Sequence, residues 1–230
     1  MTKKILSIIP ARGGSKGIPR KNIVDLAGKP LIFWTIEASL NARCISKTVV
    51  SSDDDEILAL SRQHGAEVLK RPKTLALDNS PSELVVKHVL ETLLSDGEMF
   101  DYVVLLQPTS PLRNYALIEQ ACEQLFASDA DALISVVIPQ HSPLKSFMLN
   151  GNGYLRGAVN NSYPFMPRQE LPPAYMANGA IYIISVEAFM KTQKLFTDRT
   201  LPFVMDEISS ADIDSQEDLS RIKEILEDQV

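Results

Sequence analysis

The chain has 230 residues, of which 45% are hydrophobic, and its formal net charge at pH 7 is −6. This is enough apolar material for one substantial α/β domain and too little for two large ones. The negative charge argues against an extended basic face, and therefore against broad binding to nucleic acid or to an anionic membrane.

The N-terminal segment carries two lysines and then a short apolar run, residues 5–9, that ends at Pro10. This run is far too short for a signal-peptide core or a membrane span, so we expect a cytoplasmic protein. The two cysteines, Cys44 and Cys122, have neither a CxxC nor a Cys/His metal spacing. Free thiols within helical segments, in a reducing compartment, are the simplest interpretation.

A strand leads directly into a glycine-rich loop near the N-terminus. Residues 4–9 are typical of a central strand in a parallel sheet, and ligands gather at the carboxyl ends of such strands. The following loop fits neither a Walker A loop nor a dinucleotide fingerprint, so a helix N-terminus is not expected to be the main anion holder. If this segment is a phosphate-binding loop, its positive charge would come from Arg12, Lys16, Arg20 and Lys21. The alternative is a flexible, solvated basic loop.

The next elements alternate between helix and strand. We expect helices near residues 31–38, 53–65, 80–94 and 114–127, and strands near residues 48–52, 67–69, 102–107 and 132–138. Pro30 suits a first helical position, and Ser80 suits a cap for the helix that holds Glu83. The acidic run at residues 53–55 favours a helix start, where it offsets the helix dipole, over a metal site.

Polar residues follow the strand at residues 102–107. Residues 108–113 form a rigid loop at a strand end, which is a position where substrates bind in such folds. Gln107 offers both a donor and an acceptor, which suits a sugar hydroxyl or an amide. Arg113 has two interpretations: it contacts the substrate from this loop, or it only lies near the following helix.

The composition changes at Pro139. Six of the 14 prolines lie between residues 139 and 173, and the same stretch holds several aromatic residues. Such a segment has too many aromatic side chains for a disordered linker. We therefore expect residues 139–177 to form a protruding arm that docks onto a partner surface.

Two carboxylates lie two residues apart near the C-terminus. In an extended chain Asp212 and Asp214 point the same way, while Ile213 faces the core. That pair suits one Mg²⁺, which takes one or two carboxylates together with phosphate oxygens and water. The alternative is that Asp214 only caps a helix at residues 216–227.

Four ordered motifs resemble the bacterial CMP-sialic acid synthetases, also called acylneuraminate cytidylyltransferases. They are residues 11–22 (ARGGSKGIPRKN), 106–113 (LQPTSPLR), 178–182 (NGAIY) and 212–214 (DID), and the resemblance covers nearly the whole chain. It implies a three-layer, Rossmann-like α/β fold of the nucleotide-diphospho-sugar transferase type. The sheet would be mostly parallel with one reversed strand, in a single domain over residues 1–230 with the arm at residues 139–177.

The resemblance also implies a reaction and a set of site residues. CTP would react with a nine-carbon 2-keto sugar acid, whose anomeric hydroxyl attacks the α-phosphate with Mg²⁺ as cofactor. Catalytic roles fall on Arg12, Lys21, Asp212 and Asp214, the last two as metal ligands. Nucleotide contacts fall on Ala11, Arg12, Gly13, Gly14, Ser15, Lys16, Lys21, Asn22, Arg71 and Ser82, with Asp78 in the same motif. Sugar contacts fall on Gln107, Lys145, Arg168, Gln169, Asn178, Tyr182 and Phe196.

In the family the arm crosses to a second subunit, so the resemblance implies a homodimer with shared active sites. The pair Leu195-Phe196 stands where relatives often have two aromatic residues near the acyl-group pocket, which leaves the acyl group open. The same chemistry on legionaminic acid, pseudaminic acid or Kdo remains an alternative. So does a catalytically silent module that only binds nucleotide or sugar.

Overall fold

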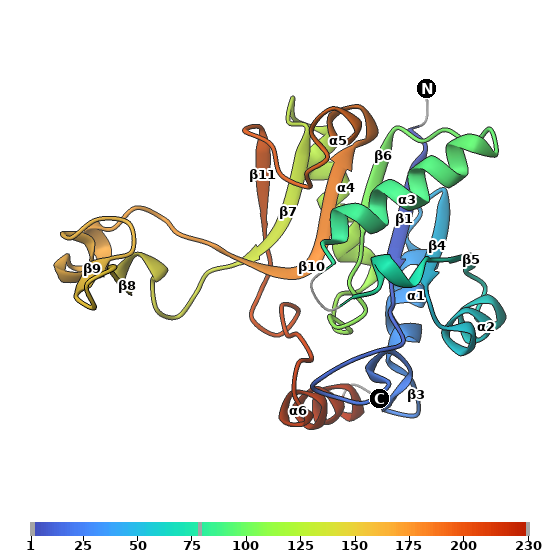
Figure 1. Cartoon of the computed structure of the whole chain (residues 1–230), viewed down its shortest axis with the longest axis horizontal. Helices are drawn as coiled ribbons and strands as arrows, with labels where there is room; N and C mark the ends of the chain where they lie inside the picture. The colour runs from blue at the N-terminus through green and yellow to red at the C-terminus, as the bar shows by residue number, and fades with distance from the viewer. Residues whose placement is uncertain (1–2, 78–79, 229–230) are drawn as a thin grey trace.

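The computed structural model describes residues 3–77 and 80–228, so Asp78 lies outside the described residues (Figure 1). Its main feature is a seven-stranded sheet in the order β11-β7-β10-β6-β1-β4-β5. The strands are β1 (Ile5–Pro10), β4 (Lys47–Ser52), β5 (Glu67–Lys70), β6 (Tyr102–Leu105), β7 (Ala132–Val137), β10 (Met176–Ser185) and β11 (Thr200–Val204).

One strand runs against the others. β1 pairs in parallel with β4 and β6, β4 with β5, and β7 with β11, whereas β10 is antiparallel to both β6 and β7. The expectation of a mostly parallel sheet with one reversed strand is confirmed. Because β10 is reversed, its beginning lies at the same edge as the carboxyl ends of the parallel strands.

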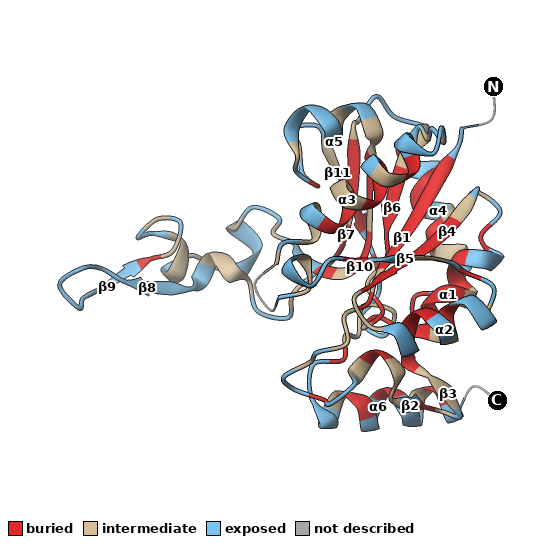
Figure 2. Ribbon diagram, turned by 45° about the vertical axis from the view of Figure 1, so that its right-hand side comes forward, coloured by how far each residue is buried: buried red, intermediate tan, exposed pale blue. Residues whose placement is uncertain are grey.

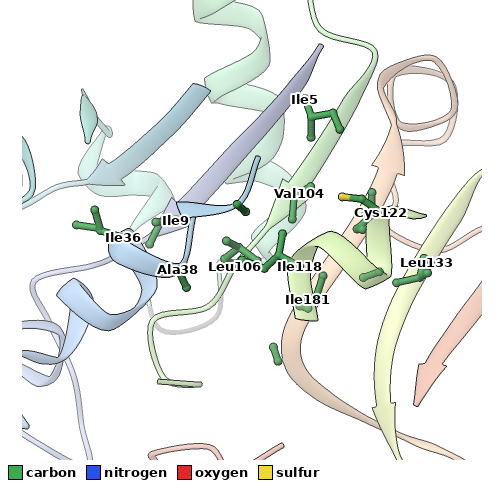
Figure 3. Packing of buried hydrophobic residues seen from close by; sticks show 14 of the residues in the cluster. Ile5, Ile9, Ile36, Ala38, Val104, Leu106, Ile118, Cys122, Leu133 and Ile181 are labelled. Carbon is green, nitrogen blue, oxygen red and sulfur yellow. The ribbon is translucent and has the colours of Figure 1, made fainter. Parts of the chain in front are cut away.

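Helices cover both faces of the sheet. The side chains of β1 alternate, so that Ile5 and Ile9 join one buried cluster while Leu6 and Ile8 join another, as the strand period of two requires. The first cluster packs against α1 (Leu31–Asn41), α2 (Asp55–Gln63) and α4 (Tyr115–Phe126) (Figure 3). The second packs against α3 (Ser82–Ser95) and α5 (Val186–Thr192). The expected three layers are confirmed.

A third, smaller cluster joins the N-terminal loop region to the C-terminal helix. The helix α6 (Gln216–Glu227) packs against the short hairpin of β2 (Asp25–Leu26) and β3 (Lys29–Pro30) (Figure 1). Ile18 from the glycine-rich loop and Ile213 from between the two carboxylates are both buried in it. The loop and the carboxylate pair therefore rest on one common core.

The chain between β7 and β10 protrudes from the sheet (Figures 1 and 2). It contains a small hairpin of β8 (Phe147–Leu149) and β9 (Leu155–Gly157) and the short 3-10 turns η3 (Pro143–Lys145), η4 (Tyr163–Phe165) and η5 (Arg168–Glu170). Many of its apolar side chains face outward, among them Phe165, which is 80% exposed. So much exposed apolar surface is unusual for a segment that contacts only water, and it is typical of an interaction surface.

Two local expectations about helix starts are wrong, and the alternative role of Asp214 as a helix cap is not found. Pro30 occupies the cap position before α1 rather than the first helical position. Ser80 does not cap α3, because Pro81 holds the cap position without a side-chain hydrogen bond. Asp214 does not cap α6 either: Ser215 does so, in a reciprocal capping box with Asp218.

The two cysteines are free, and Cys122 is buried in α4. Cys44 lies beyond the end of α1 rather than in a helix, and a hydrogen-bond contact with Cys122 lowers the pKa of its thiol. Within residues 3–77 and 80–228, no helix is long and apolar enough to cross a membrane.

Candidate active site

The motifs predicted to carry chemistry meet at one edge of the sheet. The loops that follow β1, β4, β5, β6 and β11 all leave carboxyl ends of parallel strands, and the start of β10 joins them because that strand is reversed. In open α/β sheets this edge is where ligands bind. The glycine-rich loop leads into η1 (Lys21–Ile23), a 3-10 turn, rather than into an α-helix.

A cleft of about 310 Å³ opens beside the glycine-rich loop. It gathers eight of the predicted residues, namely Arg12, Gly14, Ser15, Lys21, Asn22, Arg71, Ser82 and Gln107. Pro108 and Thr109, from the predicted substrate loop at residues 108–113, also line it. Sequence reasoning missed the other parts of its wall: Pro10, Leu75, Ala76, Leu77, Ser80 and Val85. The apolar members of that wall carry no polar signal that could have marked them, because they look like ordinary core or loop residues.

Two arginines make one part of this cleft strongly electropositive. Arg71 is only 5% exposed, and burial lowers its pKa, with the charge of Arg12 acting in the same direction and that of Asp53 against it. Within the part of the chain that the structure describes, the Nε atom of Arg71 has no hydrogen-bond partner. A buried guanidinium with an unsatisfied donor beside a second cation is suited to bind an anion such as phosphate.

Three residues predicted to contact nucleotide instead use their polar groups to shape the loop. The backbone N–H of Ala11 donates to the Ser51 carbonyl at 3.0 Å, and that of Gly13 donates to Asp53 at 3.0 Å. The buried Asn22 side chain donates to the Arg12 carbonyl at 2.8 Å. These bonds hold the loop from behind, so direct ligand contact through the same groups is not what the structure supports.

Lys16 and Lys21 differ in their surroundings. Lys16 is exposed at the loop surface. The Nζ atom of Lys21 donates to the Ile213 carbonyl at 2.8 Å and lies 3.1 Å from Asp214 Oδ1. A Cβ atom on Gly17 would lie 2.4 Å from the Asp214 carbonyl oxygen, so glycine allows this close approach. The loop is therefore docked directly onto the carboxylate pair.

The carboxylate pair combines one sheltered and one open group. Asp214 has an 81% exposed side chain, whereas Asp212 is half-buried and its Oδ1 atom has no partner among the described residues. Burial raises the pKa of Asp212, the Asp214 charge raises it further, and Thr109 and Lys21 act in the opposite direction. An orphaned carboxylate oxygen beside a second carboxylate fits a hard divalent cation.

Among the described residues, no group of three or more His, Cys, Asp or Glu side chains could hold a metal by itself. Two carboxylates are nevertheless the set expected for Mg²⁺, which completes its shell with phosphate oxygens and water. The residues present therefore fit the ion only together with a phosphate ligand in the neighbouring cleft.

A second cleft of about 430 Å³ adjoins the first, because Ser82 and Gln107 line both. Burial raises the pKa of Tyr182, and the nearby charges of Asp212 and Glu83 raise it further. Tyr182 and Phe196 are the other predicted sugar residues here. Leu195, which the sequence analysis paired with Phe196 near the acyl-group pocket, lines the cleft as well, whereas sequence reasoning missed Glu83, Lys194, Leu105 and Ile134.

Asn178 is placed differently from expectation. Its amide accepts from the Ser135 hydroxyl at 2.6 Å and from Ala180 N–H at 3.2 Å, and it donates to Ser210 at 2.9 Å and to Met205 sulfur at 3.3 Å. All of its hydrogen-bonding capacity is used inside the protein. Asn178 therefore anchors the irregular start of β10 rather than offering a free group to a sugar.

The remaining predicted sugar residues, Lys145, Arg168 and Gln169, are exposed on the arm. The arm extends away from the sheet edge of its own chain (Figure 1). The structure therefore does not bring these three together with the two clefts in a single chain.

Arg113 is fully buried at the end of the loop after β6, and burial lowers its pKa. It donates to the Ala180 carbonyl at 3.1 Å, to the Gln107 carbonyl at 3.1 Å and to the Thr35 hydroxyl at 2.9 Å. These bonds tie β6, β10 and α1 together behind Gln107. Of the two interpretations of Arg113, the structure supports a structural role.

Arg113→Lys should destabilise the protein by about 2–3 kcal/mol, because lysine keeps the charge but cannot reproduce the planar fork that satisfies two buried carbonyls. Urea unfolding measures this. Arg199→Lys, a change at an exposed arginine, should stay within about 0.5 kcal/mol of wild type. Equal stability of the Arg113→Lys protein and wild type would contradict the assignment.

The layered sheet is the fold of nucleotidyltransferases. A solved CMP:2-keto-3-deoxy-manno-octonic acid synthetase complexed with CTP has a TM-score of 0.72, with coverage of 99% of this chain and 100% of that one. A 4-diphosphocytidyl-2C-methyl-D-erythritol synthase from Anaerococcus prevotii has a TM-score of 0.68, with coverage of 99% and 100%. Sequence identities are 16% and 14%, so these likenesses establish the fold alone.

The chain belongs to the cytidylyltransferase family, whose profile matches residues 6–229. It is 36% identical over 221 residues to a pseudaminic acid cytidylyltransferase of Campylobacter jejuni, with coverage of 96% of this chain and 95% of the relative. An N-acylneuraminate cytidylyltransferase of Streptococcus agalactiae is 35% identical, with coverage of 95% of this chain and 52% of the relative. A CMP-N,N'-diacetyllegionaminic acid synthase of Legionella pneumophila is 34% identical, with coverage of 97% of both.

Proposed function

We propose that this protein transfers the cytidylyl group of CTP to a nonulosonic acid, a nine-carbon 2-keto sugar acid, and releases pyrophosphate. The carboxylate pair Asp212 and Asp214 carries the proposal, because Asp214 contacts Lys21 of the cationic cleft beside the glycine-rich loop, and the Asp212 charge acts on Tyr182 of the second, mixed polar and apolar cleft. The relatives named above act on sugars of this class, which supports the same chemistry here.

In this proposal the cationic cleft holds the triphosphate. Arg12, Arg71 and Lys21 line it and face the charge that develops on the departing pyrophosphate. Ser82, at the first turn of α3, faces the nucleoside. The sugar hydroxyl then approaches the α-phosphate from the side of Gln107 and Tyr182, which line the second cleft.

We propose Mg²⁺ as the cofactor, held by Asp212 and Asp214. When bound, this ion would neutralise charge on the phosphate oxygens and so lower the barrier to attack. Lys21, whose ammonium group already contacts Asp214, supplies a fixed positive charge at the same place.

We also propose a homodimer in which the arm of each subunit reaches the partner's second cleft. Lys145, Arg168 and Gln169 would then contact the sugar acid, with Arg168 gripping its carboxylate in a bidentate pair. Two features support this: the exposed apolar side chains of the arm, and the distance of the arm from its own sheet edge (Figure 2). The two free thiols support a reducing compartment, and we propose the cytoplasm.

The direct test is pyrophosphate release by the purified protein with CTP, ATP, GTP or UTP and a panel of sialic, legionaminic and pseudaminic acids and Kdo. The proposal predicts release with CTP, a divalent cation and at least one nine-carbon acid. Binding of CTP without turnover on any acid of the panel would instead favour the silent module.

Lys21→Ala should lower kcat/KM for CTP about 10- to 100-fold, because it removes a charge-assisted contact to phosphate. The KM for the sugar acid, measured at saturating CTP, should change little. Lys87→Ala removes a lysine on α3 that pairs with Glu91 along the same helix, and it serves as the control. A selective loss of sugar affinity in the Lys21→Ala protein would contradict the assignment.

A further inference from the structure

The acidic turn between β4 and α2 contacts both ends of the glycine-rich loop. The sequence favoured a helix-dipole role for residues 53–55 over a metal site, and Asp54 does cap α2 by accepting from the backbone N–H groups of Glu56 and Ile57 at 3.0 Å each. That cap does not account for the contacts of Asp53 and Asp54 with the loop, which lies about 40 residues earlier in the chain.

At the first end of the loop, Asp53 Oδ1 accepts from the Gly13 N–H at 3.0 Å. The fit there is close, because a Cβ atom on Gly13 would lie 2.7 Å from Asp54 Oδ2. Two residues before this contact the chain is also fixed, since the Ala11 N–H donates to the Ser51 carbonyl at the end of β4. The loop therefore leaves β1 already attached to the neighbouring strand.

At the second end, the Arg20 guanidinium binds the same turn. Its Nη1 donates to Asp54 Oδ2 at 2.5 Å, and its Nη2 donates to Asp54 Oδ1 at 3.3 Å and to Glu56 Oε2 at 2.5 Å. The Asp54 side chain is 19% exposed, and its bond with Arg20 lowers the pKa of the carboxyl. Arg20 also has a φ of 56°, a left-handed conformation that is uncommon for arginine and that these contacts hold in place.

These contacts change the role of Arg20. The sequence placed it among four cations that bind phosphate, yet its charge is compensated by two carboxylates on α2. Arg12, Arg71 and Lys21 line the cationic cleft, whereas Arg20 does not. The cation at the end of the loop is therefore directed toward the protein and not toward a ligand.

We propose that Asp53, Asp54 and Arg20 form a brace, which positions residues 12–20 for the triphosphate before nucleotide arrives. The inference rests on the proposed function. A loop with three glycines loses much conformational freedom when it is ordered, and ordering it in advance removes that cost from the binding step. The brace residues are positioning residues, because none of them contacts the reacting groups. Their effect acts on CTP and not on the sugar acid.

Two variants separate the brace from its surroundings. Asp54→Asn keeps the helix cap, since asparagine caps as well as aspartate, but removes the charge that holds Arg20. Arg20→Asn removes the guanidinium, and asparagine tolerates the left-handed backbone at this position. Asp55→Asn is the matched control, because it removes the same charge from the same helical turn. Asp55 is 89% exposed and pairs with Lys70, not with the loop.

The kinetic test measures KM for each substrate and kcat. Asp54→Asn and Arg20→Asn should each raise KM for CTP about 5- to 20-fold, leave KM for the sugar acid within about twofold at saturating CTP, and change kcat by less than about threefold. Asp55→Asn should match wild type. Equal effects on both substrates, or no difference from Asp55→Asn, would overturn the proposal.

A second measurement needs no substrate. Amide hydrogen exchange in residues 12–20 of the nucleotide-free protein should be at least tenfold faster in both brace variants than in wild type and in Asp55→Asn, while the urea midpoint stays the same. Unchanged exchange in that segment overturns the brace even if the kinetics shift. A wild-type protein that does not turn over CTP would overturn the proposed function, and the exchange experiment would still decide whether the brace exists.

Discussion

Asp212→Asn and Asp214→Asn should each lower turnover about a hundredfold or more. Each change removes one negative charge where a divalent cation and the phosphate oxygens must be held together, and such electrostatic contributions are among the largest in catalysis. Steady-state pyrophosphate release at saturating CTP and sugar acid measures the effect. Asp212 should be the more sensitive, because its Oδ1 atom is buried and has no hydrogen-bond partner among the described residues.

The control for this pair is Glu217→Gln, which removes an exposed carboxylate in the first turn of α6. It should leave turnover within about twofold of wild type, as expected for a surface change. Near-normal turnover in both aspartate variants would refute the metal assignment. Urea unfolding of each variant must also match wild type, so that lost activity cannot be attributed to lost structure.

Two inactive variants should restore each other if the arm completes the site of a partner. Arg168→Ala damages the arm and Asp214→Asn damages the carboxylate pair, so a mixed dimer has one site with both lesions and one intact site. Random pairing makes about half of the dimers mixed, and each has one working site of two. Activity should therefore recover to roughly a quarter of wild type after co-expression or joint refolding.

Formation of the mixed dimers must be verified independently, for example with two different affinity tags on the two variants. If tagged mixed dimers form while activity stays at the level of the single variants, the arm serves its own chain. A matched pair, Arg168→Ala with Lys145→Ala, places both lesions on the arm. Because every site then lacks one arm cation, this pair should show no recovery.

Much of the fold could be predicted because its signals are local. The apolar strand before the glycine-rich loop and the helix and strand periods all appear in the structure, whereas the one reversed strand was implied by the family resemblance, without saying which strand it is. The residues that cap helices were harder to predict, because several polar residues compete for the cap position within one turn. Ser215 with Asp218 satisfies more backbone groups than Asp214 alone would, and this reciprocal pair is chosen over the simpler cap.

The contacts that sequence reasoning missed join residues far apart in the chain. Arg20 and Asp54 are 34 positions apart, and the sequence shows only a cation in a basic loop and an acid at a helix start. Asn178 likewise looks like a ligand group until Ser135 and Ser210 are seen to saturate its amide. Such ion pairs and hydrogen bonds can be identified only from the folded structure, in which the sheet brings separate loops to one edge.

The measurement that tests the central claim most directly follows one oxygen atom. A nonulosonic acid labelled with ¹⁸O at its anomeric hydroxyl is incubated with CTP, Mg²⁺ and the protein, and the products are analysed by mass spectrometry. Attack of that hydroxyl on the α-phosphate predicts a CMP-sugar that retains the label and an unlabelled pyrophosphate. Label in the pyrophosphate, or CDP as the nucleotide product, would contradict the account.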